Sequence, residues 1–233
     1  MHQQLKQQVR IANQKLTDSL VDPNTTFGNL SAIDETHRFV AIKPSGIPFN
    51  ELQDNDIPIL DLNGNIIEGD KKPSSDTPTH LELYKAFPQI KSIIHTHSQT
   101  ATAFAQAKTP IKCIGTTHAD YFNGTIPVTR DLTPEEINNS YELNIGRVIV
   151  ETFNQHQPNP INPLEISACL VSSHGSFVWG DSITQTLSNA HILEQIAKLN
   201  FQTLLINPNT EINKNLLTKH YQRKHGRDAY YGQ

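Results

Sequence analysis

The chain has 233 residues and a formal net charge of −4, with 36% hydrophobic and 18% charged residues. This length is enough for one large domain or two small ones with a substantial core. The mild negative charge argues against nucleic acid as the main partner, because binding phosphate backbones requires a concentrated surplus of Lys and Arg.

The amino-terminal stretch MHQQLKQQVRIANQKL is polar and amphipathic and lacks the apolar segment of a signal peptide. No apolar run approaches the roughly 18 residues that a membrane span requires. Cys113 and Cys169 lie far apart in apolar surroundings, which predicts buried free thiols in a reducing compartment rather than a disulfide framework. We therefore expect a cytoplasmic protein that binds neither nucleic acid nor a membrane.

The first half of the chain alternates between helical and strand patterns. An apolar stripe predicts a helix over residues 4–16, followed by a loop with a short strand over 22–34 and a strand over 39–42. Asn63 and Gly64 form a strong two-residue turn signal, which predicts a hairpin over 57–67. Pro78 favours a helix over 77–87, and a strand over 91–97 and a short helix over 100–107 follow.

The second half begins with a predicted strand near 111–115. Thr133 and Glu136 form a capping box, which predicts a helix that begins there and extends to Gly146. Apolar runs predict strands over 148–153 and 167–171, and longer patterns predict helices over 183–205 and 211–225. No repeat or change of composition divides the chain, so we predict one α/β domain over residues 1–233. Because the strands do not alternate regularly with helices, a mixed or largely antiparallel sheet flanked by helices fits best.

Three histidines indicate a metal site. In KSIIHTHS, His95 and His97 are two residues apart on a predicted strand, so their side chains point to one face and can share an ion. The pair alone is also compatible with ordinary strand histidines. His174 follows the predicted strand SACLV and precedes Gly175, where the backbone can approach closely. Three nitrogens with an open position are typical of catalytic zinc, and no cysteine has the spacing of a structural zinc site.

Two further features have alternative interpretations. Asp76 lies just before the predicted helix 77–87, where it is suited to cap that helix; capping and metal ligation are compatible. The carboxy-terminal Lys219, Arg223, Lys224 and Arg227 are basic, and we interpret them as a solvated helix face that complements the helix dipole.

Seven segments resemble, in order, the L-ribulose-5-phosphate 4-epimerases of the class II aldolase/epimerase family over nearly the whole chain: GNLS, IKPSG, KKPSSDTPTH, IIHTHS, GTTHADYF, SSHGSFVWG and KHGRDAYYGQ. Of these, GTTHADYF and the terminal YYGQ are typical of the epimerases rather than of the family at large. The resemblance implies a three-layer α/β/α domain with a central, mostly antiparallel mixed sheet. It also implies a homotetramer with active sites between subunits.

The resemblance assigns roles to residues of this chain. The residues it implies as ligands of Zn²⁺, or of another divalent metal, are Asp76, His95, His97 and His174. The residues it implies for binding the sugar phosphate are Gly28, Asn29, Lys43, Ser45, Gly46, Ser74 and Ser75. Small residues with hydroxyl and backbone N–H groups beside a helix start suit a phosphate, although each segment alone would be an ordinary turn.

The same resemblance implies Asp120 and Tyr231 as a catalytic acid/base pair contributed by different subunits. Taken alone, Asp120 is a loop carboxylate and Tyr231 an aromatic in a terminal tail. The implied reaction inverts C4 of L-ribulose 5-phosphate to give D-xylulose 5-phosphate. The C4–H is not acidic, because the carbonyl is at C2, and the chain has no NAD-type glycine fingerprint. Retro-aldol cleavage of C3–C4 and re-addition remain, with zinc as Lewis acid and one proton-transfer group on each face.

Two rival functions remain open. A class II aldolase would cleave a sugar phosphate and release both fragments, and a metal-binding or structural protein would have no turnover. The sequence also leaves open the native metal, the substrate preference, and an arabinose or an ascorbate-type pentose pathway. Ser172 and Ser176 stand where some relatives have His and Pro, which concerns the tuning of the site rather than its ligands.

Overall fold

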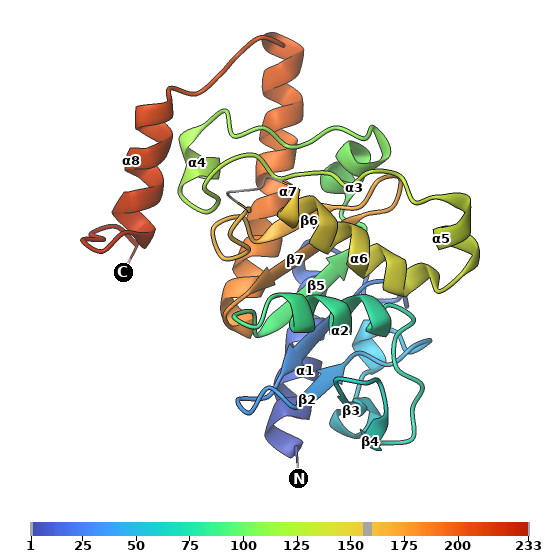
Figure 1. Cartoon of the computed structure of the whole chain (residues 1–233). Helices are drawn as coiled ribbons and strands as arrows, with labels where there is room; N and C mark the ends of the chain where they lie inside the picture. The colour runs from blue at the N-terminus through green and yellow to red at the C-terminus, as the bar shows by residue number, and fades with distance from the viewer. Residues whose placement is uncertain (1, 156–159, 233) are drawn as a thin grey trace.

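A computed structural model describes residues 2–155 and 160–232 of the chain, so Gln233 of the terminal motif lies outside the described residues (Figure 1). The described residues form a seven-stranded sheet in the order β4-β3-β2-β1-β5-β7-β6. The strands are β1 (Asn29–Ile33), β2 (Phe39–Ile42), β3 (Ile59–Asp61), β4 (Ile66–Glu68), β5 (Ser92–Thr96), β6 (Ala168–Leu170) and β7 (Ser176–Gly180). All neighbouring strands pair antiparallel, so the predicted antiparallel character is confirmed and extends to every pair.

Helices cover both faces of this sheet. They are α1 (Gln3–Lys15), α2 (Thr77–Ala86), α3 (Gln99–Gln106), α4 (Thr116–Ala119), α5 (Pro134–Asn138), α6 (Tyr141–Asn154), α7 (Ile183–Ile206) and α8 (Lys214–His225). Helices α1 and α7 pack on one face, and α2 and α6 lie together over the other (Figure 1). Trp179 of β7 joins the second layer to the sheet through ring contacts with Phe87 and Phe153. The predicted three-layer α/β/α fold is thereby confirmed.

Local sequence signals explain several boundaries. The predicted hairpin is present as β3 and β4, and Gly64 has the positive φ (88°) that its turn requires. The capping box is also present, because the Thr133 side chain accepts from the Glu136 N–H while the Glu136 carboxylate accepts from the Thr133 N–H. Both buried thiols, Cys113 and Cys169, are free as predicted.

Four predictions of secondary structure were wrong or incomplete. The helix predicted from Thr133 to Gly146 is interrupted at Ser140, which takes a left-handed conformation, so α5 ends before it and α6 begins after it. Residues 148–153 form the second half of α6 rather than a strand, because Ile145, Val148, Ile149 and Phe153 recur at helical spacing and are all buried. The β-branched composition of that run favoured a strand, but packing against α2 determined the outcome. Residues 111–115 contain only an isolated bridge and lead into α4, which was not predicted. Strand β7 was not predicted as a strand of its own, distinct from the segment that contains His174.

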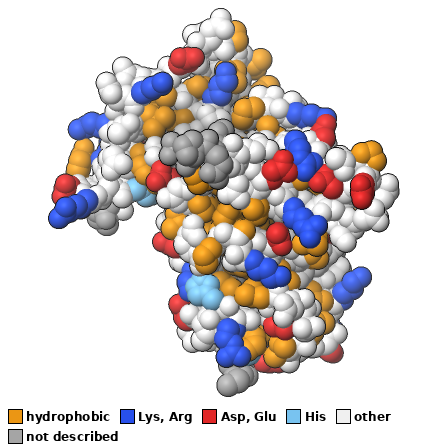
Figure 2. All heavy atoms as spheres, viewed as in Figure 1, with side chains coloured by type: hydrophobic (Ala, Val, Ile, Leu, Met, Phe, Trp, Pro, Cys, Tyr) orange, Lys and Arg blue, Asp and Glu red, His pale blue; other side chains and the backbone are white. Residues whose placement is uncertain are grey.

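None of the described helices combines the length and the apolar character needed to cross a membrane. On the face shown in Figure 2, acidic and basic side chains are interspersed rather than gathered by sign.

Gly146 lets α6 approach α2 closely, which gives a test of the packing. A Cβ at this position would lie 2.8 Å from the Glu82 Cβ and 3.2 Å from the Thr79 carbonyl oxygen. Gly→Ala inside a helix normally stabilises by about 1 kcal/mol. Here we expect Gly146→Ala to lower the free energy of unfolding, by about 1–3 kcal/mol, because the helices must separate. Urea unfolding measures this.

Gly115→Ala is the matched control, because a Cβ at Gly115 meets nothing within 4 Å. It should change the free energy of unfolding by no more than about 0.5 kcal/mol. A Gly146→Ala protein as stable as the wild type would contradict the close packing of α2 and α6.

Candidate metal centre and substrate pocket

A pocket of about 370 Å³ lies at the end of the sheet where β1 and β7 begin and β5 ends. Its lining residues are Thr26, Phe27, Gly28, Asn29, Lys43, Pro44, Ser45, Gly46, Ser74, Ser75, Asp76, His95, His97 and His174. All eleven residues predicted to bind metal or sugar phosphate therefore surround one cavity. The two predicted acid/base residues do not line it.

The register of three central strands places His95, the first candidate ligand. Asn29 of β1 pairs with His95 of β5, and His95 pairs with Phe177 of β7, so the three side chains lie abreast on one face. The His95 ring stacks on the Phe177 ring at 4.3 Å between centroids. Its Nδ1 lies 3.0 Å from the Ser176 carbonyl oxygen, which leaves Nε2 directed toward the pocket. His97 follows directly after β5.

A tight turn brings His174 to the same place. Its N–H donates to the Val171 carbonyl oxygen (3.0 Å), and the Val171 N–H donates to that of Gly175 (2.8 Å). Ser173 takes a left-handed conformation, with φ 60°. A Cβ at Gly175 would lie 2.8 Å from the Thr96 carbonyl oxygen, so only glycine allows this approach. The close approach predicted at Gly175 is confirmed.

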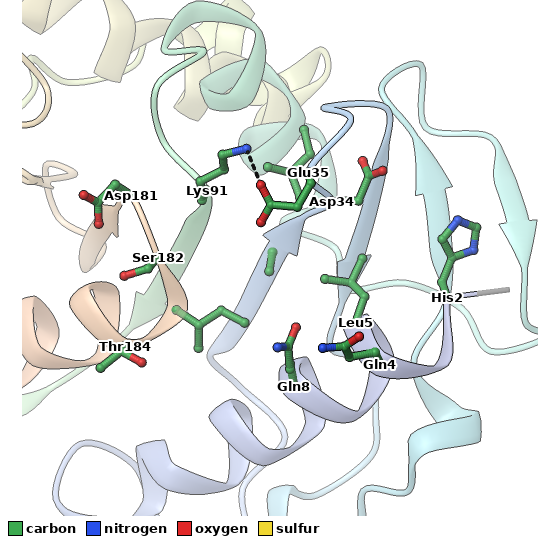
Figure 3. A pocket seen from close by; sticks show the side chains of 13 residues that line it. His2, Gln4, Leu5, Gln8, Asp34, Glu35, Lys91, Asp181, Ser182 and Thr184 are labelled. Carbon is green, nitrogen blue, oxygen red and sulfur yellow. Dashed lines mark hydrogen bonds and ion pairs between the residues drawn. The ribbon is translucent and has the colours of Figure 1, made fainter.

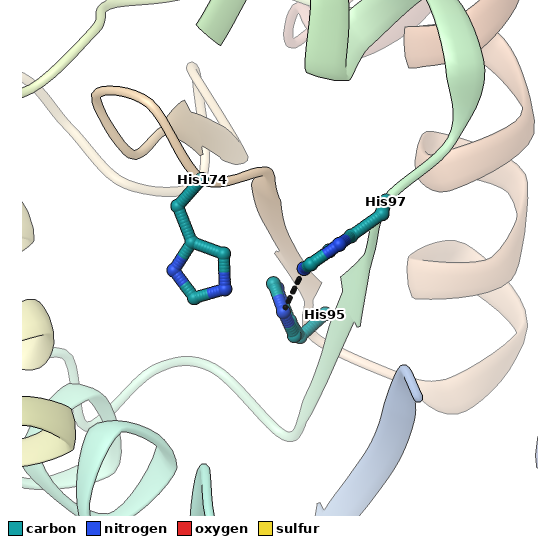
Figure 4. Close-up of side chains that lie close together, drawn as sticks. All are labelled: His95, His97 and His174. Carbon is teal, nitrogen blue, oxygen red and sulfur yellow. Dashed lines mark hydrogen bonds between the residues drawn. The ribbon is translucent and has the colours of Figure 1, made fainter. Parts of the chain in front are cut away.

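The three histidines converge on one point (Figure 4). One ring nitrogen from each lies within 4.8 Å of the others, and the Nε2 atoms of His95 and His97 are 3.1 Å apart. The Nδ1 of His174 is buried and has no hydrogen-bond partner among the described residues. Burial lowers the pKa of His95 to about 3 and also lowers the pKa values of His97 and His174, so the rings are neutral near pH 7. Three neutral imidazoles suit a divalent ion such as zinc.

Asp76 faces this cluster and does not cap α2. It is the residue before the helix, yet its side chain makes no capping hydrogen bond, so the capping interpretation was wrong. Its Oδ2 instead accepts from Nδ2 of Asn29 at 2.6 Å. Burial alone would raise the pKa of Asp76, but electrostatic interaction with His95 and His80, together with this hydrogen bond, keeps the pKa below its usual value. The carboxylate is therefore ionised beside the histidines.

Small residues form the wall next to Asp76. Nδ2 of Asn29 also donates to Oγ of Ser74 at 3.0 Å, so one amide joins the metal side of the pocket to the predicted phosphate side. The backbone N–H groups of Ser45 and Ser74 already donate to carbonyls, at 2.9 and 3.1 Å. Within the described residues, the N–H groups of Gly46 and Ser75 make no such bond and stay available to an anion.

Lys43 lines the pocket, but its ammonium is not directed at an open anion site. The side chain is buried, and Nζ donates to the carbonyl oxygens of Thr26 (3.0 Å) and Ile47 (2.7 Å). Burial lowers its pKa to about 8. Lys43 therefore ties together the two loops that flank the phosphate side, and its charge acts on the pocket from behind them.

Asp120 and Tyr231 lie together elsewhere on the chain, in the corner formed by α4 and α8 (Figure 1). Arg223 donates to both carboxylate oxygens of Asp120, from Nε at 3.0 Å and Nη2 at 2.9 Å, and His220 contacts the same carboxylate. Burial raises the pKa of Asp120, but these hydrogen bonds outweigh it and lower the pKa. The Arg223 guanidinium also lies over the Tyr231 ring, 4.0 Å from its centroid.

The contacts between α4 and α8 bear on two expectations from the sequence: the subunit origin of Asp120 and Tyr231, and the role of the basic residues. Within one chain, Asp120 and Tyr231 share a single arginine, so they do not have to come from two different subunits to lie near each other. The basic residues of α8 are also not simply a solvated face, because Arg223 pairs with Asp120 and Lys224 lies over the Tyr121 ring at 3.3 Å. The isolated charge pattern could not reveal these partners.

Sequence reasoning missed Phe27, Thr26 and Pro44 in the pocket wall. Phe27 is the most distinctive of them, with 52% of its surface exposed and its ring 5.7 Å from that of His97. The only available signal was an aromatic residue placed directly before Gly28 in an otherwise polar loop.

A second cavity, of about 490 Å³, lies between α1, the β1–β2 turn and the start of α7 (Figure 3). Its charged groups include Asp34, Glu35 and Asp181, and Lys91 pairs with Glu35 at 3.4 Å. This surplus of carboxylates repels a sugar phosphate, and the cavity lacks converging histidines. The histidine pocket is therefore the better candidate.

The Gly175 contact gives a direct test of the metal centre. We expect Gly175→Ala to displace His97 and the β5 end, and so to reduce bound divalent metal per chain by about tenfold or more at limiting metal. Ser173→Gly is the matched control in the same turn, because it adds no bulk and should retain metal. Elemental analysis after dialysis measures both, and full metal content in Gly175→Ala would contradict the proposed ligand geometry.

Comparisons with known proteins agree with this architecture. The family described as "Class II Aldolase and Adducin N-terminal domain" matches residues 9–201. An L-fuculose 1-phosphate aldolase structure has 24% identity and TM-score 0.77, covering 94% of this chain and 95% of its own. YgbL from Klebsiella pneumoniae has 25% identity and TM-score 0.70, with 94% and 98% covered. L-fuculose-1-phosphate aldolase from Thermus thermophilus has 21% identity and TM-score 0.65, with 88% and 97% covered. The chain belongs to the class II aldolase and adducin N-terminal domain family.

Proposed function

We propose that this chain is a zinc-dependent L-ribulose-5-phosphate 4-epimerase, which interconverts L-ribulose 5-phosphate and D-xylulose 5-phosphate. The observation that best supports metal-dependent chemistry on a sugar phosphate is the joining of two sites in one pocket: a cluster of three neutral histidines and a wall of small hydroxyl and amide groups. A pentulose phosphate has a group for each site. Its carbonyl end suits the cation, and its phosphate suits Gly46, Ser74 and Ser75.

A divalent cation held by His95, His97 and His174 supplies Lewis-acid stabilisation of the negative charge that develops at the C2 carbonyl. A protein base accepts the proton of the C4 hydroxyl, the C3–C4 bond breaks, and its electron pair forms the enediolate of dihydroxyacetone. Glycolaldehyde phosphate is the other fragment. After the aldehyde turns, C3 attacks its opposite face and the new alkoxide takes a proton from the protein.

The phosphate side of the pocket determines whether the fragments recombine. The N–H groups of Gly46 and Ser75 and the hydroxyl of Ser74 would hold glycolaldehyde phosphate by the end that does not react. The aldehyde then rotates without leaving. Asn29 contacts both Ser74 and Asp76, which fixes the phosphate side relative to the metal side.

We propose Asp120 and Tyr231 as the two proton-transfer groups, one for each face. Neither lines the pocket of its own chain, so they would act on the pocket of a neighbouring chain in a homotetramer. Their common contact with Arg223 supports delivery as one unit. The lowered pKa of Asp120 keeps its carboxylate ionised and so able to accept a proton, but makes it a weaker base.

The second candidate is a class II sugar-phosphate aldolase. The solved structures similar to this chain favour it, because two of those cited carry the name L-fuculose 1-phosphate aldolase. The metal cluster and the small-residue wall serve both reactions equally. The epimerase is preferred because of GTTHADYF and YYGQ, the two segments that resemble epimerases in particular.

Product analysis separates the two candidates. With L-ribulose 5-phosphate, we expect D-xylulose 5-phosphate as the main product and no accumulation of dihydroxyacetone, measured by NMR of the mixture. Release of dihydroxyacetone as main product would identify an aldolase instead. His97→Asn should lower kcat about 100-fold or more, since it removes a ligand of the Lewis acid, whereas Ser173→Gly should not. Epimerisation at full rate by metal-free protein would overturn the zinc proposal.

Subunit mixing tests the shared site. His97→Asn and Tyr231→Phe should each be nearly inactive alone, but co-expressed heteromers carrying both should recover roughly a quarter of wild-type activity, because random mixing pairs an intact histidine cluster with an intact tail at that frequency. Heteromers that contain two copies of the same variant under different tags are the control. Absence of any recovery in the mixed heteromers would contradict delivery of Tyr231 from a neighbour.

A further inference from the structure

A buried chain of hydrogen bonds lies beneath the metal centre, outside the lining of the pocket. The Tyr84 hydroxyl is 2.8 Å from Oγ of Ser31, and that oxygen is 2.7 Å from Nδ1 of His80. Ser31 and His80 are fully buried, and Tyr84 is 3% exposed. Strand β1 contributes Ser31 and helix α2 contributes the other two, so the chain spans the layer between sheet and helix.

The donor and the acceptor of each hydrogen bond in this buried chain can be assigned. Burial raises the pKa of Tyr84 and lowers that of His80 to about 4, so the phenol keeps its hydrogen and the imidazole carries a single N–H. Among the described residues, the Tyr84 hydroxyl bonds only to Ser31, so the phenol donates to Ser31 and Ser31 donates to Nδ1 of His80. The opposite order would leave the phenol hydrogen without an acceptor. The proton of His80 is therefore on Nε2.

This Nε2–H is buried and has no hydrogen-bond partner among the described residues. A buried donor without an acceptor is unfavourable, so the site requires an acceptor. Asp76 is a charged group suited to this role: it precedes His80 by four residues at the start of α2, and its carboxylate acts electrostatically on His80. No described residue hydrogen-bonds to Oδ1 of Asp76, since Asn29 uses Oδ2.

The His80 ring is also linked to His95 through the ring of Phe177. It meets the Phe177 ring edge-on at 5.9 Å, and Phe177 stacks on His95 at 4.3 Å. The position of the His80 ring is therefore linked to two proposed metal ligands, to Asp76 through charge and to His95 through Phe177.

We propose that His80 is a positioning residue of the candidate metal centre: its Nε2–H, unpaired among the described residues, is the donor that orients the Asp76 carboxylate when a divalent cation binds. This inference rests on the proposed metal site but concerns a residue that never touches the cation. Ser31 sets the tautomer of His80, and Tyr84 fixes the hydroxyl of Ser31. The buried chain thus determines which imidazole nitrogen carries the proton.

The test is a zinc affinity measured by competition with a chromophoric chelator, on wild type, His80→Phe, Asp76→Asn and the double variant. Phenylalanine keeps the ring against Phe177 and removes the Nε2–H. We expect His80→Phe to weaken zinc binding by about 10–100-fold. In the Asp76→Asn background, the same change should have no further effect, because His80 acts through that carboxylate.

Two other variants separate positioning from folding. His80→Gln can donate from nearly the place of Nε2 and should recover part of the affinity that His80→Phe loses. If His80→Phe does not fold, Ser31→Ala supplies the test. It leaves the imidazole in place but frees its tautomer, and should weaken zinc binding by about threefold, the scale of one neutral hydrogen bond.

His118→Phe is the matched control, because His118 is also buried, packs against the Phe122 ring and lies outside the pocket. Its zinc affinity should equal that of the wild type. Wild-type affinity in His80→Phe, or an equal loss with and without the Asp76 carboxylate, would overturn the role of His80 while leaving the proposed function intact. A wild-type protein that binds no zinc would overturn the proposed metal site itself.

Discussion

The candidate metal centre depends on the antiparallel register of β1, β5 and β7. In this register Asn29, His95 and Phe177 lie side by side across the sheet, on the face that α2 covers. A shift of one residue in β5 would turn His95 to the opposite face and replace it by a neighbour of different chemistry. The phosphate side is held by the same constraint, because the amide that bonds Ser74 and Asp76 belongs to Asn29. Strand pairing, rather than loop conformation, therefore sets the relation between the two halves of the pocket.

The sequence predicted those parts of the fold for which a local signal and tertiary packing agree. The Asn63 and Gly64 turn and the Thr133 capping box are of this kind, since the residues that signal the structure also make its hydrogen bonds. The run 148–153 is the opposite case. Its β-branched residues favour a strand locally, but its burial against α2 requires a helix, and the sequence alone does not show what lies opposite. The strand predicted near 111–115 is absent for the same reason. Its apolar residues form only an isolated bridge and no paired strand.

The residues that line the pocket were easier to predict from the sequence than the hydrogen bonds that they make. The histidine spacing and the family resemblance together named eleven residues that all line one cavity, yet they gave no indication that the Asp76 side chain makes no capping hydrogen bond or that the Lys43 ammonium bonds to backbone carbonyls. Those outcomes depend on what surrounds each side chain in three dimensions. His80 shows the limit most clearly, because nothing in its sequence neighbourhood indicates a partner on β1.

The contact between Arg223 and Asp120 joins a part of the chain inside the family match to a part that follows it. The match covers residues 9–201, so Asp120 and the histidine pocket lie inside it, and Arg223 and Tyr231 lie after it. Arg223 reaches back to pair with Asp120. Changes confined to α8 would therefore alter the surroundings of Asp120 without touching the proposed cation and phosphate ligands. In a chain built in this way, the proposed proton-transfer groups can change while the proposed binding pocket stays the same.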